Sequence, residues 1–219
     1  MKNVVGMIEA AMLIPGWTPA DELLALYALA LGTSSLPGDV VEIGSWCGRS
    51  SVVLAEATQH SHAVLYCVDL WPERQDWYQN TDGSWSFKAV GQQGYGQQTV
   101  WNEPFVRDIE PVYRRGFLIA QFHANVAPYS HVGVLRGTSS AVYTQSVRLA
   151  FLDGDHGYDA VMNDVHALSW RIVKGGWLCF DDAHSGYEGV DRAIAKLAED
   201  STFGHGVQLT RKLWAVQKR

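Results

Sequence analysis

The stretch Phe151-Leu-Asp-Gly-Asp-His156 places an acidic turn directly after an apolar run that predicts a buried β-strand. A second apolar run with the same kind of ending, Gly176-Trp-Leu-Cys-Phe-Asp-Asp182, follows about one helix later. The carboxyl ends of neighbouring strands in an open α/β sheet border the crevice that binds ligands. We therefore expect an open α/β sheet with an acidic ligand crevice.

Strands and helices alternate on both sides of these two runs. Apolar runs predict strands at residues 40–43, 64–68, 132–136, 147–152 and 177–180, with helices between them. Residues 206–210 and 212–217 predict a final antiparallel hairpin. This alternation is typical of a doubly wound, mostly parallel seven-stranded sheet in a Rossmann-like α/β fold.

Two helices carry particular boundary signals. In the N-terminal helical segment, residues 1–37, Thr18 predicts an N-cap, Pro19 the first helical position, Asp21 a box-like cap and Gly32 the end. Its predicted apolar stripe consists of Leu23, Leu26, Tyr27 and Leu31. A later helix follows Asp159, carries Val161, Val165, Leu168 and Ile172, and is expected to stop at Gly175-Gly176.

Composition narrows the class of protein. The chain has 219 residues, of which 47% are hydrophobic and 18% charged, which favours one globular domain over residues 1–219. A net charge of −6 argues against nucleic acid or an anionic membrane as a partner. The cysteines lie in or beside apolar runs, so we expect reduced core thiols at Cys47, Cys67 and Cys179. No secretion signal or membrane span is evident, and we expect a cytoplasmic protein.

Residues 71–116 interrupt the alternation. They hold Trp71, Trp77, Tyr78, Trp85, Phe87, Tyr95 and Trp101 among Gln, Gly and Asn. A long insertion over the edge of a sheet is often a lid or binding loop, and aromatic side chains also suit a contact between subunits. The segment is therefore a candidate for the substrate pocket or for a homo-oligomer interface, with a dimer as the default.

The first strand runs through a glycine-rich turn into a helix, in the stretch Val40-Val-Glu-Ile-Gly-Ser-Trp-Cys-Gly-Arg-Ser-Ser51. Gly44 and Gly48 allow the backbone to approach a ligand closely. The spacing does not fit the dinucleotide fingerprint, and Glu42 disfavours a pyrophosphate at this turn. Asp69 ends the second strand, where an acidic residue accepts hydrogen bonds from ribose hydroxyls.

The acidic strand ends also suggest a metal ion. Asp153, Asp181 and Asp182 would repel one another unless a cation lay between them. Carboxylates in this number suit Mg²⁺ or another divalent cation. The simpler alternative is that Asp181 and Asp182 cap the start of the next helix.

These motifs resemble a known family. Glu42-Ile-Gly-Ser-Trp-Cys-Gly-Arg-Ser50 is similar to the first motif of class I S-adenosylmethionine-dependent methyltransferases, especially the catechol O-methyltransferase-like group. Phe151-Leu-Asp-Gly-Asp-His-Gly-Tyr158 and Phe180-Asp-Asp-Ala-His184 resemble metal-dependent macrocin and cephalosporin-type O-methyltransferases. The likeness spans residues 38–195 outside the aromatic insertion. Asp182 departs from the catechol-type relatives, which carry asparagine there.

The resemblance implies a function and a set of site residues. The 44–50 loop would hold the methionine part of S-adenosylmethionine, Asp69 the ribose, and residues 137–139 would lie by the adenine. The implied cofactor-binding residues are Glu42, Gly44, Ser45, Trp46, Gly48, Ser50, Asp69, Leu70, Thr138, Ser139 and Asp153. Asp153, Asp181 and Asp182 match the metal ligands. The acceptor would be a hydroxyl of a small molecule, such as a natural-product phenol, sugar or macrolide.

Methyl transfer to a hydroxyl needs a base, and two candidates follow Asp153. His156 has the intrinsic pKa of about 6.5 that suits proton removal near neutrality. Asp155 would need a raised pKa, which crowded carboxylates can supply. His184 is expected to line the pocket.

Three alternatives to this function stay open at the level of sequence. They are a metal-supported N-methyltransferase, a non-catalytic S-adenosylmethionine- or nucleoside-binding protein, and an NAD-dependent oxidoreductase. The last is disfavoured by the missing dinucleotide fingerprint.

Overall fold

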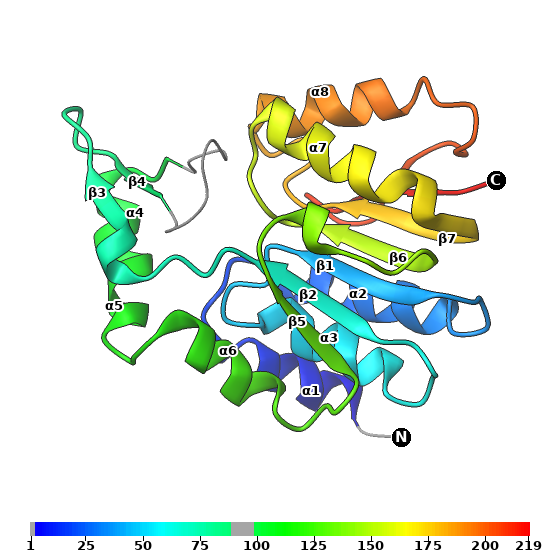
Figure 1. The fold of residues 1–219 in the computed structure, drawn as a ribbon, viewed down its shortest axis with the longest axis horizontal. Helices are drawn as coiled ribbons and strands as arrows, with labels where there is room; N and C mark the ends of the chain where they lie inside the picture. Colours follow the sequence, from blue (N-terminus) through cyan, green and yellow to red (C-terminus); the bar gives the residue numbers. More distant parts are fainter. Residues whose placement is uncertain (1–2, 89–98) are drawn as a thin grey trace.

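A computed structural model describes residues 3–88 and 99–219 of the chain. Its centre is a seven-stranded sheet in the order β5-β2-β1-β6-β7-β9-β8 (Figure 1). The strands are β1 Asp39–Ile43, β2 Leu65–Asp69, β5 Val132–Arg136, β6 Val147–Leu152, β7 Ile172–Phe180, β8 Val207–Gln208 and β9 Trp214–Gln217. The first five in the spatial order are parallel, and β9 is antiparallel to β7 and β8. The predicted doubly wound sheet with its antiparallel hairpin is confirmed.

Helices cover both faces of this sheet (Figure 1). One face carries α1 Val4–Ala11, α2 Ala20–Gly32, α3 Arg49–Thr58 and α6 Leu118–Val126, and the other carries α7 Tyr158–Leu168 and α8 Glu188–Leu197. Successive side chains of a strand point to opposite faces. Leu149 and Phe151 therefore pack into one core, and Ala150 and Leu152 into the other.

Helix α2 begins differently from the prediction. Its N-cap is Pro19, with no side-chain cap hydrogen bond, so the predicted cap by Thr18 and Asp21 is wrong. Thr18 instead contacts the start of α3: its carbonyl accepts a hydrogen bond from Arg49 Nη1 at 3.2 Å. The end of the helix at Gly32 is confirmed.

The buried face of α2 also differs from the predicted stripe. Leu23 and Leu26 are buried, but Leu31 is 50% exposed, whereas Glu22 is 0% exposed. Glu22 lies four residues before Leu26 and therefore on the same face of the helix. A carboxyl group thus enters the interior from the N-terminal segment.

The predicted helix end at Gly175-Gly176 is wrong. Helix α7 stops at Leu168, and β7 already begins at Ile172. The glycines lie inside β7, where Gly175 has φ +83° and a Cβ on Gly176 would lie 2.8 Å from the Arg148 carbonyl oxygen. They allow close strand packing and an irregular register between β6 and β7, so they do not mark the end of a helix.

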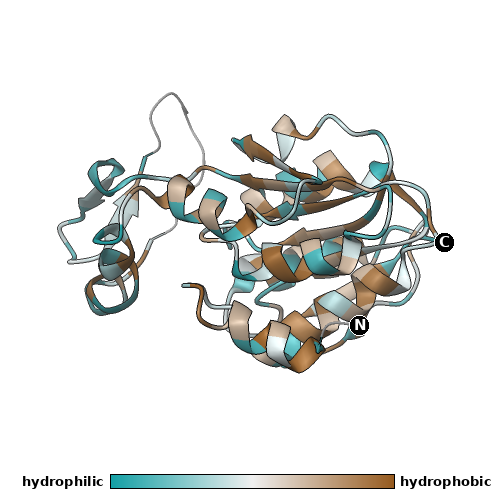
Figure 2. Ribbon diagram, turned by 90° about the horizontal axis from the view of Figure 1, so that it is seen from below, coloured by the Kyte–Doolittle hydropathy of each residue, from teal (hydrophilic) through white to brown (hydrophobic). Residues whose placement is uncertain are grey.

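Within the segment 71–116, residues 72–88 and 99–116 form a small unit that stands to one side of the sheet in both views (Figures 1 and 2). It contains the antiparallel strands β3 Trp77–Gln79 and β4 Trp85–Phe87, then α4 Asn102–Pro104, a π-helical turn Phe105–Ile109 and α5 Glu110–Tyr113. Residues 89–98, with the predicted Tyr95, lie outside the described part.

Several aromatic side chains of this unit pack internally. Trp77 and Phe105 are buried with Ile109 in a core of their own, and the Trp85 ring stacks on Phe105 at 4.2 Å. Trp71 packs in the main core against Phe122. Exposed aromatic surface in the described part of the unit includes Tyr78 and Trp101. Much of the aromatic content predicted for a ligand or subunit contact therefore stabilises the unit itself.

Two further expectations concern the whole chain. Cys47, Cys67 and Cys179 are free thiols in the buried core, as predicted. A membrane-crossing helix needs about 20 apolar residues, and none of the helices in the described part of the chain meets that demand.

Candidate active site

The turn after β1 is shaped by glycine. Gly44 has φ +92° and Gly48 has φ +93°, both in the left-handed region. A Cβ on Gly44 would lie 1.9 Å from the carbonyl oxygen of Asp153. The Asp153 N–H donates to the Ile43 carbonyl at 2.8 Å. The predicted cofactor loop thus lies directly against the acidic loop after β6.

Asp69 joins three loops. Its carboxylate accepts the backbone N–H of Trp46 at 2.8 Å and that of Trp71 at 2.6 Å, and its carbonyl accepts the N–H of Gly137 at 2.9 Å. Burial raises the pKa of Asp69, although the backbone hydrogen bonds oppose this shift. Each carboxylate oxygen has a second lone pair, so Asp69 still has acceptor capacity for a ligand hydroxyl.

Some predicted cofactor residues support the loop from below. Glu42 is fully buried, which raises its pKa, and its Oε2 accepts a hydrogen bond from the Ser51 hydroxyl. This contact joins the end of β1 to the first turn of α3. Trp46 Nε1 is buried and has no hydrogen-bond partner in the described structure.

The predicted adenine side also has internal contacts. Leu70 accepts a hydrogen bond from Arg136 Nε at 3.1 Å through its carbonyl. The Thr138 hydroxyl lies 2.8 Å from that of Ser140, and the Ser139 hydroxyl bonds to Asp164. The loops that hold residues 69–70 and 137–139 are therefore neighbours, as predicted.

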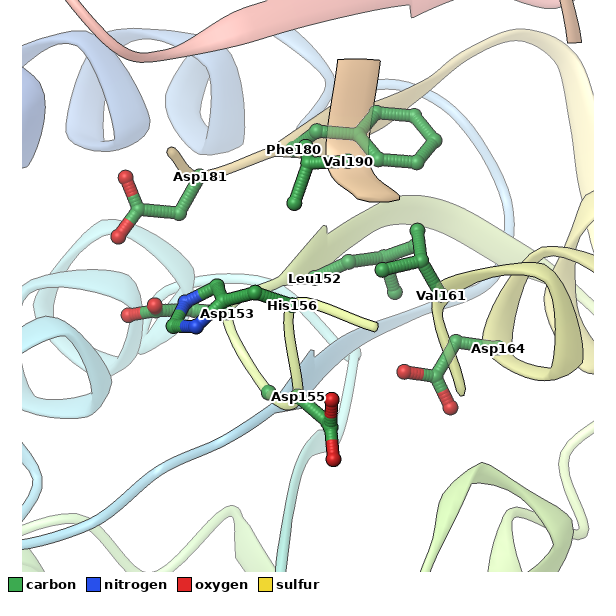
Figure 3. A pocket seen from close by; sticks show the side chains of 10 residues that line it. Leu152, Asp153, Asp155, His156, Val161, Asp164, Phe180, Asp181 and Val190 are labelled. Carbon is green, nitrogen blue, oxygen red and sulfur yellow. The ribbon is translucent and has the colours of Figure 1, made fainter. Parts of the chain in front are cut away.

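The acidic residues lie at the ends of adjacent strands. The Asp181 N–H donates to the Leu152 carbonyl at 2.9 Å, which aligns the end of β7 with the end of β6. A cavity between them is lined by Leu152, Asp153, Gly154, Asp155, His156, Val161, Asp164, Phe180, Asp181 and Val190 (Figure 3). Burial and then the charge of Asp181 raise the pKa of Asp153 well above its ordinary value.

His156 forms a pair with Asp182. Nε2 of His156 lies 2.9 Å from Asp182 Oδ2, and the imidazole stacks on the Tyr187 ring at 4.0 Å. Burial would raise the pKa of Asp182, but the hydrogen bond with His156 and the charge of Lys212 hold it below its ordinary value. The ionised carboxylate can orient the imidazole.

Asp155, the other base candidate, has different surroundings. Its Oδ1 accepts the N–H of Gly157 at 2.7 Å, at the start of α7. In Figure 3 Asp153 and His156 point to the side of the cavity where Asp181 lies, whereas Asp155 points away from them. These contacts favour a role for Asp155 in the helix start.

His184 does not line the cavity as expected. Its side chain is 60% exposed, and its Nδ1 lies 3.2 Å from Asp191 Oδ1 on α8. The backbone at His184 has φ 57°, which turns the chain between β7 and α8.

Two residues missed by the sequence reading complete the acidic end. Lys212 Nζ lies 2.8 Å from Asp181 Oδ2, 3.3 Å from Asp182 Oδ1 and 3.8 Å from Glu22 Oε2. Burial and then the charge of Asp181 raise the pKa of Glu22 to about 9. Burial opposes charge on Lys212, yet Asp181 keeps the pKa of the ammonium above its ordinary value. Glu22 could have been found from its helical spacing to Leu26, which places it on the buried face, but no sequence signal indicated Lys212.

A protein-family model described as a methyltransferase domain matches residues 41–183, well over half of the chain. The chain belongs to this family. The match contains both the glycine turn and the acidic strand ends.

Solved methyltransferases have the same fold. The O-methyltransferase NovP is 16% identical over 93% of this chain and 83% of its own, with a TM-score of 0.63. CalS11, a calicheamicin methyltransferase, is 17% identical over 90% of this chain and 78% of its own, with a TM-score of 0.60. TomG from Streptomyces achromogenes, an O-methyltransferase of tomaymycin synthesis seen with S-adenosylmethionine, is 15% identical over 100% and 90%, with a TM-score of 0.56. Family and fold confirm the predicted class I methyltransferase.

The methyltransferase loop has features that fit a nucleoside-bearing ligand. Gly44 and Gly48, both in the left-handed region, have no side chain that would keep a ligand from the backbone there, and the buried Nε1 of Trp46 offers a donor without an internal partner. Asp69 retains acceptor capacity beside them. A sulfonium nucleoside such as S-adenosylmethionine would meet this loop with its amino-acid part and Asp69 with its hydroxyls.

The predicted metal position fits less well. In the described part of the chain, no three His, Cys, Asp or Glu side chains are arranged to hold a metal ion. The ammonium of Lys212 already lies between the carboxylates of Asp181 and Asp182. Because it donates to the same oxygens and repels a second cation, these side chains as arranged do not fit a divalent ion. Metal dependence stays a prediction of the resemblance.

Proposed function

We propose that this methyltransferase transfers the methyl group of S-adenosylmethionine to a hydroxyl oxygen of a small molecule, with His156 as the base. The contact of His156 with Asp182 at 2.9 Å is the observation that carries the proposal. His156 and Asp153 belong to the same loop after β6. This loop lies next to the glycine turn, because the Asp153 carbonyl closely approaches Gly44. Base and donor loop are therefore neighbours.

The chemistry requires few parts. S-adenosylmethionine supplies an electrophilic methyl carbon on a sulfonium sulfur. The acceptor oxygen must lie in line with it at about 3–3.5 Å. As the new C–O bond forms and the S–C bond breaks, the hydroxyl proton passes to His156. In the neutral imidazole one nitrogen donates and the other accepts, and the contact with Asp182 uses Nε2.

The nature of the acceptor is argued from the base and the relatives. A hydroxyl must lose its proton during methylation, and a histidine oriented by a carboxylate can take up that proton. A neutral amine needs no base before it attacks the methyl group, so the presence of a base favours a hydroxyl acceptor. CalS11 is a calicheamicin methyltransferase, and TomG is an O-methyltransferase of tomaymycin synthesis. We therefore propose a natural-product phenol, sugar or macrolide hydroxyl as the acceptor class. A homo-oligomer, a role of the 71–116 unit in it, and a cytoplasmic location stay predictions.

Donor binding is tested first. The thermal midpoint of the pure protein is measured with S-adenosylmethionine and, separately, with NAD. A ligand at 100 times its dissociation constant adds about 2.7 kcal/mol of stability. We expect S-adenosylmethionine to raise the thermal midpoint and NAD to leave it unchanged. A midpoint that S-adenosylmethionine does not raise would contradict the proposal.

The base is tested by His156→Ala, with His184→Ala as the matched control on the same side of the sheet. With an acceptor found by mass shift, we expect His156→Ala to lower turnover by about 10²–10⁴-fold and to leave the donor-induced midpoint shift unchanged. His184→Ala should behave like the wild type. Unchanged turnover in His156→Ala would refute the role of the base, and a mass shift on an amine only would identify an N-methyltransferase.

A further inference from the structure

A buried lysine stands at the acidic end of the sheet. We define the Lys212 cluster as Lys212, Glu22, Asp181, Asp182 and Asp153. The ammonium contacts the carboxylates of Asp181 and Asp182, which directly follow β7, at 2.8 Å and 3.3 Å, and lies 3.8 Å from Glu22 of the N-terminal segment. Only 6% of Lys212 is exposed. The cluster thus contains a resident positive charge at the place where its acidic residues converge.

The backbone around Lys212 belongs to the same site. Its carbonyl accepts the N–H of Ala183 at 2.9 Å, so the turn before β9 is attached to the loop after β7. Ala183 and Leu213 are both fully buried. The backbone of Lys212 is therefore joined to the loop that carries Asp182.

A divalent ion would compete for the same position. Mg²⁺ binds carboxylate oxygens at about 2.1 Å. An ion on Asp181 Oδ2 would then lie within about 5 Å of the Lys212 ammonium, because Nζ is 2.8 Å from that oxygen. Repulsion between the two cations is strong at this distance in a buried site. One cation excludes the other.

We propose that Lys212 is the built-in cation of this methyltransferase: its ammonium holds Asp181 and Asp182 in place, so that Asp182 orients His156 and turnover needs no added divalent metal. Lys212 is a positioning residue that acts through Asp182. The part about turnover rests on the proposed function, whereas the exclusion of divalent ions does not.

The test uses metal binding, which needs no acceptor. Protein treated with EDTA and desalted is titrated with Mn²⁺, and free Mn²⁺ is measured by electron paramagnetic resonance. The variants are Lys212→Met, Lys212→Arg and the control Lys196→Met, which removes an exposed lysine paired with Glu199 on α8. Thermal midpoints are recorded with and without Mn²⁺.

We expect wild type, Lys212→Arg and Lys196→Met to leave Mn²⁺ free at concentrations up to 1 mM, on the order of the weakest protein sites for divalent ions. Lys212→Met should have a lower midpoint in EDTA, bind one Mn²⁺ and recover midpoint on binding. One tight Mn²⁺ in the wild type, lost in Asp181→Asn, would overturn the proposal. So would a folded Lys212→Met that binds none. Should that variant not fold, the wild-type titration decides.

Turnover is read separately once an acceptor is known. EDTA-treated wild type should keep full activity, and Lys212→Arg should retain more of it than Lys212→Met. Loss of wild-type activity in EDTA with recovery in Mg²⁺ would overturn the proposal. No turnover under any condition would count against the proposed function only, because Mn²⁺ exclusion is measured without it.

Discussion

Replacing Asp164 by asparagine should make the stability of the protein depend differently on pH. Asp164 lies on α7 and lines the cavity, where burial, with the charge of Asp155 as a smaller cause, raises its pKa to about 6 against the hydrogen bond from Ser139. The ordinary pKa of an aspartate, which applies in the unfolded chain, is 3.8. A carboxyl whose pKa is raised in the folded state lowers the free energy of unfolding at every pH at which the unfolded chain ionises it. This loss of stability is zero well below pH 3.8, grows between pH 3.8 and about pH 6, and is constant above that.

The magnitude follows from the difference in pKa. A rise of about two pKa units corresponds to a cost of about 3 kcal/mol at pH 7 and about 1 kcal/mol at pH 4.5. Asparagine has no charge and keeps an acceptor for the Ser139 hydroxyl. Relative to wild type, Asp164→Asn should therefore gain about 2 kcal/mol of unfolding free energy between pH 4.5 and pH 7.

Urea unfolding followed by tryptophan fluorescence at the two pH values measures this gain. The control is Asp159→Asn, an exposed position in the first turn of the same helix, where the change between the two pH values should stay below about 1 kcal/mol. An Asp164→Asn variant whose stability relative to wild type is the same at both pH values, or falls as the pH rises, would refute the reasoning.

Two further predictions concern the cofactor loop. Gly44→Ala should lower stability by about 3 kcal/mol or more, because the alanine would be strained in the left-handed region and would also clash with Asp153. The control Gly83→Ala, with φ +84° but nothing within 4 Å of its Cβ, should lower stability by only about 1–2 kcal/mol. Equal thermal midpoints for the two variants would contradict this prediction. Asp69→Asn leaves one acceptor oxygen for the two N–H groups of the adjoining turns, including that of Trp46, so calorimetry should find S-adenosylmethionine binding weakened by about tenfold. Unaltered donor affinity would show that Asp69 does not shape the site.

Much of the fold followed from signals between neighbours in the chain. The apolar runs that end in Asp69, Asp153 and Asp181 predicted three parallel strands, and Gly44 and Gly48 predicted the turn into α3. Such signals are local, because side-chain periodicity and left-handed turns are properties of adjacent residues. The position of the candidate site at the strand ends followed from the same signals.

Local signals were misleading where a residue had a distant partner. Gly175 and Gly176 suggested a helix end, but they lie in β7 because the Arg148 carbonyl approaches there. The aromatic residues of the insertion suggested a ligand surface, yet Trp77 and Phe105 became the core of a separate unit. In both cases the decisive neighbour is far away in the sequence.

The sequence by itself determined the sheet, the glycine turn and the convergence of the carboxylates. Only the tertiary structure decided what lies among those carboxylates, namely Lys212 from the last hairpin and Glu22 from the N-terminal helix. Whether Lys212 and Glu22 point into the interior depends on how the last hairpin, helix α2 and the loop after β7 pack together. That packing is set by side-chain volumes and charges across the whole core, which no local pattern contains.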